Sequence, residues 1–127
     1  MQDRFKFRAW NLEKGIMHYD VEDTYDGISN NAIQHSNFSA VLEDNEYIVM
    51  QCTGFKDRNG KLIYEGDVVS FGSENEDIGI IEWDNDECRF IVDEKFNNSI
   101  SDFSNWYCNE LEIIGNIYQN PELLKII

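Results

Sequence analysis

The chain has 127 residues, of which 42% are hydrophobic and 13% aromatic, so it is rich enough in apolar side chains to fold and is not disordered as a whole. Ten lysine and arginine residues face 25 aspartate and glutamate residues, which gives a formal net charge of -15. This charge repels phosphate groups, so we expect no direct binding to nucleic acid or to anionic lipid. The acidity either keeps the protein soluble or attracts basic surfaces of other proteins, and both interpretations stay open.

Cysteine and histidine are too few and too widely spaced for a metal site. Cys52, Cys88 and Cys108 form no CxxC pair, and the chain has two histidines. A zinc site needs four converging ligands, so we expect no metal and no cofactor, and we interpret the cysteines as free buried thiols. The first ten residues lack the apolar core of a signal peptide, and no apolar run is long enough to span a membrane. These features predict a cytoplasmic protein without membrane contact.

The N-terminal half begins with a predicted β-hairpin. Residues 5–10 alternate between apolar and polar side chains, which is the period of a half-buried strand, and a turn separates them from a second strand near 16–21. Residues 22–37 are polar and are predicted to form a surface loop. Residues 38–42 are too short to distinguish a strand from a helical turn. Residues 47–53 are β-branched and apolar, which predicts a central strand.

The C-terminal half is predicted to consist of short strands joined by tight turns. Asn59-Gly60 indicates a hairpin turn, because both residue types tolerate a positive φ angle. Polar residues 93–105 predict a long loop. Gly115 marks a bulge or a close approach in the last strand, and Pro121 begins a short helix that ends near residue 125. The strands are expected at 62–64, 68–71, 78–83, 88–92 and 111–118.

These elements predict a mostly β fold without βαβ units. We expect an N-terminal β-hairpin region plus a small bent SH3-like barrel, with a short C-terminal helix. Residues 1–127 are interpreted as a single domain, with candidate lobes at 1–55 and 56–127.

Several polar motifs have both a structural and a functional interpretation. Asp57 and the neighbouring glycines of residues 53–67 favour turn chemistry over a ligand-binding edge. The acidic run 83–87 resembles part of a calcium loop but lacks its glycine and its twelfth-position ligand, so we favour a solvated hairpin turn. The aromatic residues lack a basic groove that would support base stacking, which makes core packing the better interpretation. No nucleophile or phosphate-binding motif appears, so we expect no catalysis.

The central segment MQCTGFKDRNGKLIYEGDVV (50–69) is similar to the central motif of YopX-like proteins. The opening FKFRAW (5–10) and the closing LEIIGNIYQNPELL (111–124) resemble the two ends of that family, so the resemblance spans the chain. Cys52 departs from the pattern, which usually has an aromatic residue there. The resemblance implies a phage or prophage accessory protein of Gram-positive bacteria, found in the host cytoplasm, with a mostly β fold, an oligomeric assembly and no catalytic residues.

Three functions follow as hypotheses. The first is a self-assembling protein-binding module, a homo-oligomer that engages a host or phage protein; the second is an acidic DNA-mimic-type inhibitor of a basic host nucleic-acid-binding protein; the third, which we do not favour, is an enzyme on a small β scaffold. The residues predicted to contact a partner or a subunit are Tyr64, Glu65, Asp67, Glu82, Asp84, Asp86, Leu123 and Leu124.

Overall fold

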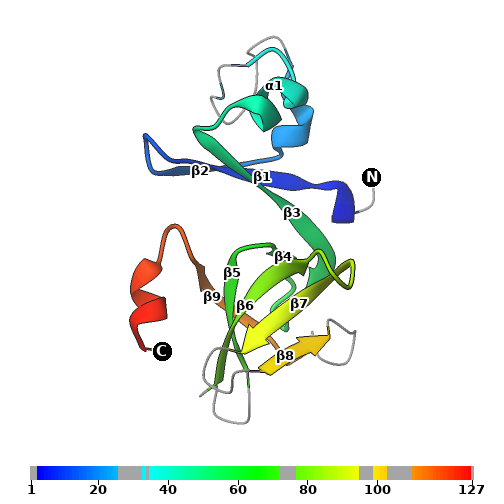
Figure 1. Cartoon of the computed structure of the whole chain (residues 1–127), viewed down its shortest axis with the longest axis vertical. Coiled ribbons are helices and arrows are strands. Elements are labelled where there is room, and N and C mark those ends of the chain that lie inside the picture. Colours follow the sequence, from blue (N-terminus) through cyan, green and yellow to red (C-terminus); the bar gives the residue numbers. More distant parts are fainter. Residues whose placement is uncertain are drawn as a thin grey trace. The chain divides into compact units, whose positions relative to one another are not determined.

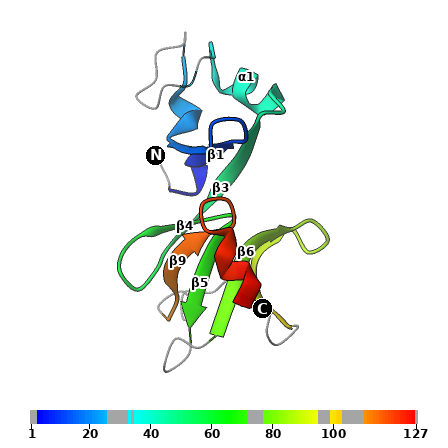
Figure 2. The same cartoon turned by 90° about the vertical axis from the view of Figure 1, so that its left-hand side faces the viewer.

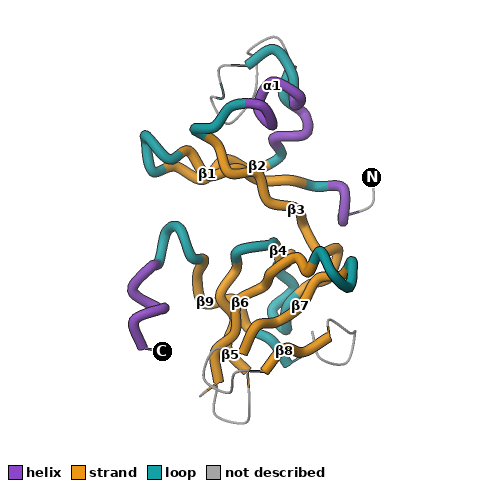
Figure 3. Tube along the Cα trace, viewed as in Figure 1, coloured by secondary structure: helices purple, strands orange, loops and turns teal. Residues whose placement is uncertain are grey.

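The computed structural model describes residues 3–25, 33, 35–71, 77–94, 99–102 and 110–126 (Figure 1). Strands predominate over helices in this part of the chain, so the predicted mostly β fold is confirmed (Figure 3). The chain divides into two compact units, residues 1–52 and 53–127. The division falls within one long strand, β3 (Tyr47–Lys56), near the boundary suggested by the candidate lobes.

The first unit contains the predicted N-terminal hairpin. A 3-10 helix at Asp3–Phe5 precedes β1 (Phe7–Asn11), so the strand begins later than the alternation of 5–10 suggested. β1 pairs antiparallel with β2 (Ile16–Tyr19) on one side and with the first part of β3 on the other. Among the described residues of this unit, β2 therefore lies at one edge of the sheet.

A small helix closes the core of the first unit. α1 (Phe38–Glu43) resolves the ambiguity of residues 38–42, and it begins at Asn37 because that side chain accepts a hydrogen bond from the N–H of Ala40 at 2.9 Å. The surface loop predicted for 22–37 is wrong in two places: a 3-10 helix occupies Val21–Asp23, and Ile33 is fully buried. The burial of Ile33 was not predictable, because a single apolar residue among polar neighbours shows no periodic pattern. The buried cluster consists of Ala9, Val21, Ile33 and Val41.

Two like charges meet beside the hairpin turn of the first unit. The main-chain N–H of Leu12 donates to the carbonyl of Glu46, and the charge of Glu13 and then a hydrogen bond between the two carboxyl groups raise the pKa of Glu46. Because the folded-state pKa is raised, protonation as the pH falls through it favours the folded state. We expect Glu13→Gln to return the pKa of Glu46 toward its ordinary value, measured by NMR titration of the carboxyl carbons. An unchanged pKa would contradict this pairing.

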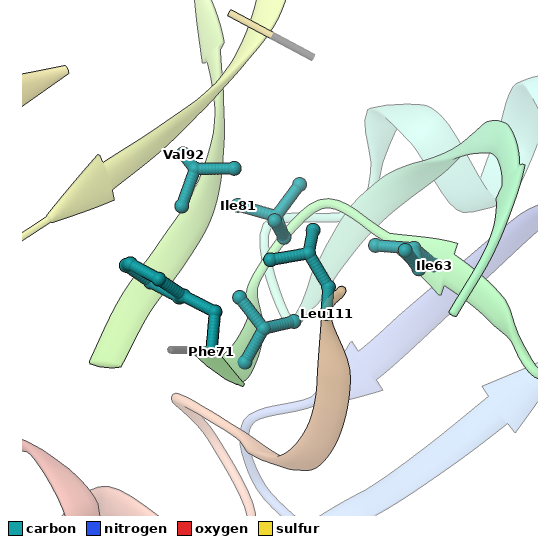
Figure 4. Packing of buried hydrophobic residues seen from close by; sticks show 6 residues of the cluster. Ile63, Phe71, Ile81, Val92 and Leu111 are labelled. Atoms are coloured by element: carbon teal, nitrogen blue, oxygen red, sulfur yellow. The ribbon is translucent and has the colours of Figure 1, made fainter. Parts of the chain in front are cut away.

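The second unit is a curled five-stranded sheet that forms a half-barrel, which confirms the predicted strong bending. The second part of β3 lies beside β4 (Leu62–Tyr64). The five-stranded sheet is separate from this pair and has the strand order β8-β7-β6-β5-β9. Its strands are β5 (Asp67–Phe71), β6 (Asp77–Asp84), β7 (Arg89–Glu94), β8 (Ser99–Asp102) and β9 (Glu112–Asn116). Figure 4 shows the apolar side chains that fill the curl. They are Ile63, Val69, Phe71, Ile81, Val92 and Leu111.

The long loop predicted for 93–105 is partly wrong, because β8 lies within it and pairs antiparallel with β7. The Ser-rich sequence of this edge strand carries no apolar alternation that would have revealed it. Residues 72–76, which precede β6, and residues 103–109 lie outside the described residues.

The predicted irregularity of the last strand is confirmed. The pairing of β9 with β5 shifts register between Val68 and Val69, so that Gly115 opposes Val68 and Ile113 opposes Val69. The predicted C-terminal helix is present as a 3-10 helix at Pro121–Ile126, and Figure 2 shows it in front of β5 and β6.

Candidate functional site

Buried carboxylates of the central motif, residues 50–69, accept hydrogen bonds from main-chain N–H groups and so hold the backbone in place. The buried carboxylate of Asp57 accepts hydrogen bonds through Oδ1 from the N–H groups of Asn59 and Lys61, both at 2.9 Å, and through Oδ2 from the N–H of Ile113 at 3.0 Å. One side chain therefore joins the turn between β3 and β4 to the distant strand β9. Arg58 adds a salt bridge to Glu112 across the same junction. These contacts support the turn interpretation of the motif over a ligand-binding edge.

The turn itself differs from the predicted two-residue hairpin. Gly60 has a φ of 83°, whereas Asn59 is not among the described residues with positive φ. The N–H of Gly60 donates to the carbonyl of Asp57, and the N–H of Asp57 donates to the carbonyl of Lys61. This is a three-residue loop that ends in a left-handed glycine, so Asn59 contributes turn propensity without a positive φ.

The predicted contact residues of the Tyr-Glu-Gly-Asp turn are only partly accessible. Tyr64 is 6% exposed and Asp67 is 2% exposed, so their predicted role as surface contacts does not fit their burial. The carboxylate of Asp67 accepts the main-chain N–H of Tyr64 at 2.8 Å and thereby closes the turn. Glu65 between them is half-buried. The hydrogen bond of Asp67 supports the turn interpretation of residues 53–67.

Glu82, Asp84 and Asp86 lie together on the hairpin formed by β6 and β7. β5 pairs with β6 only from Asp77 to Ile80, and the N–H of Gly66 makes one further bond to the carbonyl of Ile81. Beyond that point, β6 is paired with β7 alone among the described residues. We call residues 82–90 the acidic arm, a two-stranded ribbon that carries four carboxylates and one arginine.

The tip of the acidic arm is a turn closed by one carboxylate. Oδ1 of Asp84 accepts hydrogen bonds from the N–H groups of Asp86 at 3.0 Å and Glu87 at 3.4 Å. Asp84 is half-buried, while the side chains of Asp86 and Glu87 are exposed. This geometry supports the hairpin-turn interpretation of residues 83–87. Among the described residues, no group of three or more His, Cys, Asp or Glu is arranged to hold a metal ion.

An exposed tryptophan lies among these carboxylates and corrects the prediction that the tryptophans serve core packing. Trp83 is 42% exposed and is the cross-strand partner of Phe90, with ring centroids 5.0 Å apart and planes at 72°. The Trp83–Phe90 pair was not predicted, because residue type alone assigns aromatic side chains to the core. No local pattern predicts the exposure of Trp83, because it depends on β5 pairing with β6 only as far as Ile80.

The remaining predicted contacts and the cysteines have mixed surroundings. Leu123 and Leu124 are half-buried in the C-terminal 3-10 helix, and Leu123 lies against β9 at Gly115. Part of the apolar tail is therefore covered by its own chain. Cys52 is buried as predicted, whereas Cys88 at the base of the arm turn is exposed, which contradicts the prediction of buried thiols for that residue.

Comparisons with known proteins place the chain in a family. The profile of the YopX protein family matches residues 6–125. The chain is similar to the crystal structure of protein EF1440 from Enterococcus faecalis, with 25% identity and a TM-score of 0.62 over 94% of this chain and 96% of that one. It shares its fold with yopX from Bacillus subtilis, with 23% identity and a TM-score of 0.55 over 94% of this chain and 98% of that one. Curated proteins gave no match. The chain belongs to the YopX protein family.

Proposed function

We propose that this protein is a non-catalytic accessory protein that acts by binding another protein and by associating with copies of itself. The observation that carries the proposal is the acidic arm, in which an exposed tryptophan lies on a ribbon with four carboxylates. A partly exposed indole is often the centre of a protein contact, because tryptophan buries a large apolar area at a small cost in entropy. The proposal includes a phage or prophage origin and action in the bacterial cytoplasm, which the family resemblance supports.

Self-association has a separate surface that suits it. In the described part of its unit, β2 is an edge strand that contains no Asp, Glu, Lys or Arg. Ile16 is 46% exposed and Tyr19 is 45% exposed. Edge strands of soluble proteins are usually protected by charge, because their unpaired N–H and C=O groups can add a further strand. Two chains that each carry a charge of -15 repel one another. Contact through an uncharged edge strand therefore has the lowest electrostatic cost.

Light scattering after size exclusion tests the self-association. We expect the wild-type protein to be larger than a monomer at high micromolar concentration, and Ile16→Glu to shift it toward the monomer by placing a charge on the strand. Leu42→Glu is the matched control, because Leu42 is also exposed but belongs to α1. A clean monomer for the wild-type protein would contradict self-association. An oligomer that Ile16→Glu leaves intact would exclude the β2 edge.

The alternative function is an acidic inhibitor that occupies the nucleic-acid-binding surface of a basic protein. The net charge of -15 and the carboxylates of the acidic arm favour it. Its distinguishing property is salt dependence, because exposed charge pairs are screened within about 10 Å at 0.1 M salt. Protein captured from host cytosol on the tagged chain should then elute as the salt is raised. A captured partner that resists high salt would count against the inhibitor.

A further inference from the structure

We propose that the acidic arm is a docking site for a basic segment of another protein, and that an arginine of that segment stacks on Trp83 while neighbouring carboxylates hold its guanidinium group. This inference rests on the proposed function and names the site and the chemistry of the partner.

The arrangement of the arm separates an aromatic face from an acidic face. Trp83 and Phe90 face each other across the strands, and strand alternation places Glu82 and Asp84 on the other side of the ribbon. Asp84 opposes Arg89, which is the single basic residue of the arm. The exposed carboxylates of Asp86 and Glu87 follow at the turn. In this proposal a guanidinium group stacked on the indole is held by the carboxylates of the turn, because Glu82 and Asp84 lie on the other face.

The chemistry of these groups selects a cation with a flat surface. Indole is the aromatic ring that attracts cations most strongly, and a guanidinium group stacks on it while donating paired hydrogen bonds to a carboxylate. The edge-to-face contact with Phe90, at 72°, fixes the indole without covering it, since Trp83 stays 42% exposed. Arginine therefore fits the arm better than lysine, whose ammonium group cannot stack.

The net charge of the arm determines which class of partner can bind to it. The arm carries four acidic residues and one basic residue, a net of three negative charges. A second copy of the chain would bring another net charge of -15 to this surface, and nucleic acid would bring phosphates, so both are repelled. A basic protein segment is attracted, and the attraction also increases the rate of encounter.

Titration of the whole protein with a nona-arginine peptide at low salt tests the inference, with a nona-lysine peptide for comparison. The first variant removes the four arm charges through Glu82→Gln, Asp84→Asn, Asp86→Asn and Glu87→Gln, which preserves the acceptor oxygen of residue 84 in the turn. The matched control removes four exposed charges of the first unit through Glu13→Gln, Asp23→Asn, Glu43→Gln and Glu46→Gln. The two variants have equal net charge, so a difference between them reports the location of binding.

We expect the arm variant to weaken nona-arginine binding by at least about tenfold and the control variant by less than about threefold. Trp83→Ala should weaken it by about fivefold, Trp83→Phe by less, and Tyr25→Ala, which removes a 60% exposed aromatic side chain elsewhere, should have little effect. Nona-arginine should bind more tightly than nona-lysine. Equal weakening by both charge variants, or no binding by the wild-type protein, would overturn the arm as the docking site, while a partner bound through another surface would still support the proposed function.

Discussion

Replacing Asp57 with alanine is expected to destabilise the second unit by about 4 kcal/mol, because three N–H groups lose a charged acceptor in a buried position. This is a large share of the stability of a small domain, which is about 5–15 kcal/mol. Urea unfolding followed by tryptophan fluorescence measures the loss.

Two variants make the result specific to the hydrogen bonds of Asp57. Asp57→Asn keeps an oxygen for the N–H groups of Asn59 and Lys61 but places an NH2 group toward the N–H of Ile113, so an intermediate loss is expected. Asp86→Ala removes an exposed carboxylate from another turn and should change the stability by less than about 0.5 kcal/mol. Equal losses for Asp57→Ala and Asp86→Ala would contradict the role of Asp57 as a clamp.

Gly115→Ala is expected to destabilise the attachment of the C-terminal helix by about 2 kcal/mol. A Cβ at this position would lie 2.6 Å from Oδ1 of Asn120 and 2.9 Å from Cδ1 of Leu123. The Asn120 side chain cannot move freely, because its oxygen accepts the N–H of Asn116 at 3.2 Å and its NH2 group donates to Glu122. The added methyl group must therefore displace the turn, the helix or both.

Thermal unfolding and amide hydrogen exchange of residues 116–124 measure this effect. Gly115→Ala should lower the melting temperature and speed exchange in the turn after β9. Ile114→Ala is the control, because the neighbouring side chain is 38% exposed and is expected to cost less than about 1 kcal/mol. Unchanged exchange in Gly115→Ala would show that the helix does not depend on the close approach.

The strands of this fold were predictable wherever turn chemistry and alternation coincide. Asp57 to Gly60 and Glu65 to Asp67 mark turns by residue type, and the strands between them follow. β8 was not predictable, because a short Ser-rich edge strand is held by its pairing with β7 rather than by a pattern of its own. Ile33 is buried in the core of the first unit by tertiary contacts, and the spacing of apolar residues around it does not predict this burial.

The candidate site was predictable in its charges and not in its aromatic centre. Glu82, Asp84 and Asp86 were identified because carboxylates concentrate there. The exposure of Trp83 depends on where β5 ends beside β6, which is a property of the sheet and not of the local sequence. Tyr64 and Asp67 failed as surface candidates for a similar reason, since their burial follows from the packing around the turn that Asp67 closes.

Affinity capture from host cytosol tests whether the acidic arm binds another protein. Three tagged forms are compared: the wild-type chain, the variant with a neutralised arm, and the control variant with four charges removed from the first unit. Proteins retained on each are quantified by mass spectrometry at low salt. We expect a basic protein to be retained by the wild-type chain and by the control variant, and to be lost from the arm variant. Retention of the same proteins by all three forms, or of none by the wild-type chain, would contradict protein binding through the acidic arm.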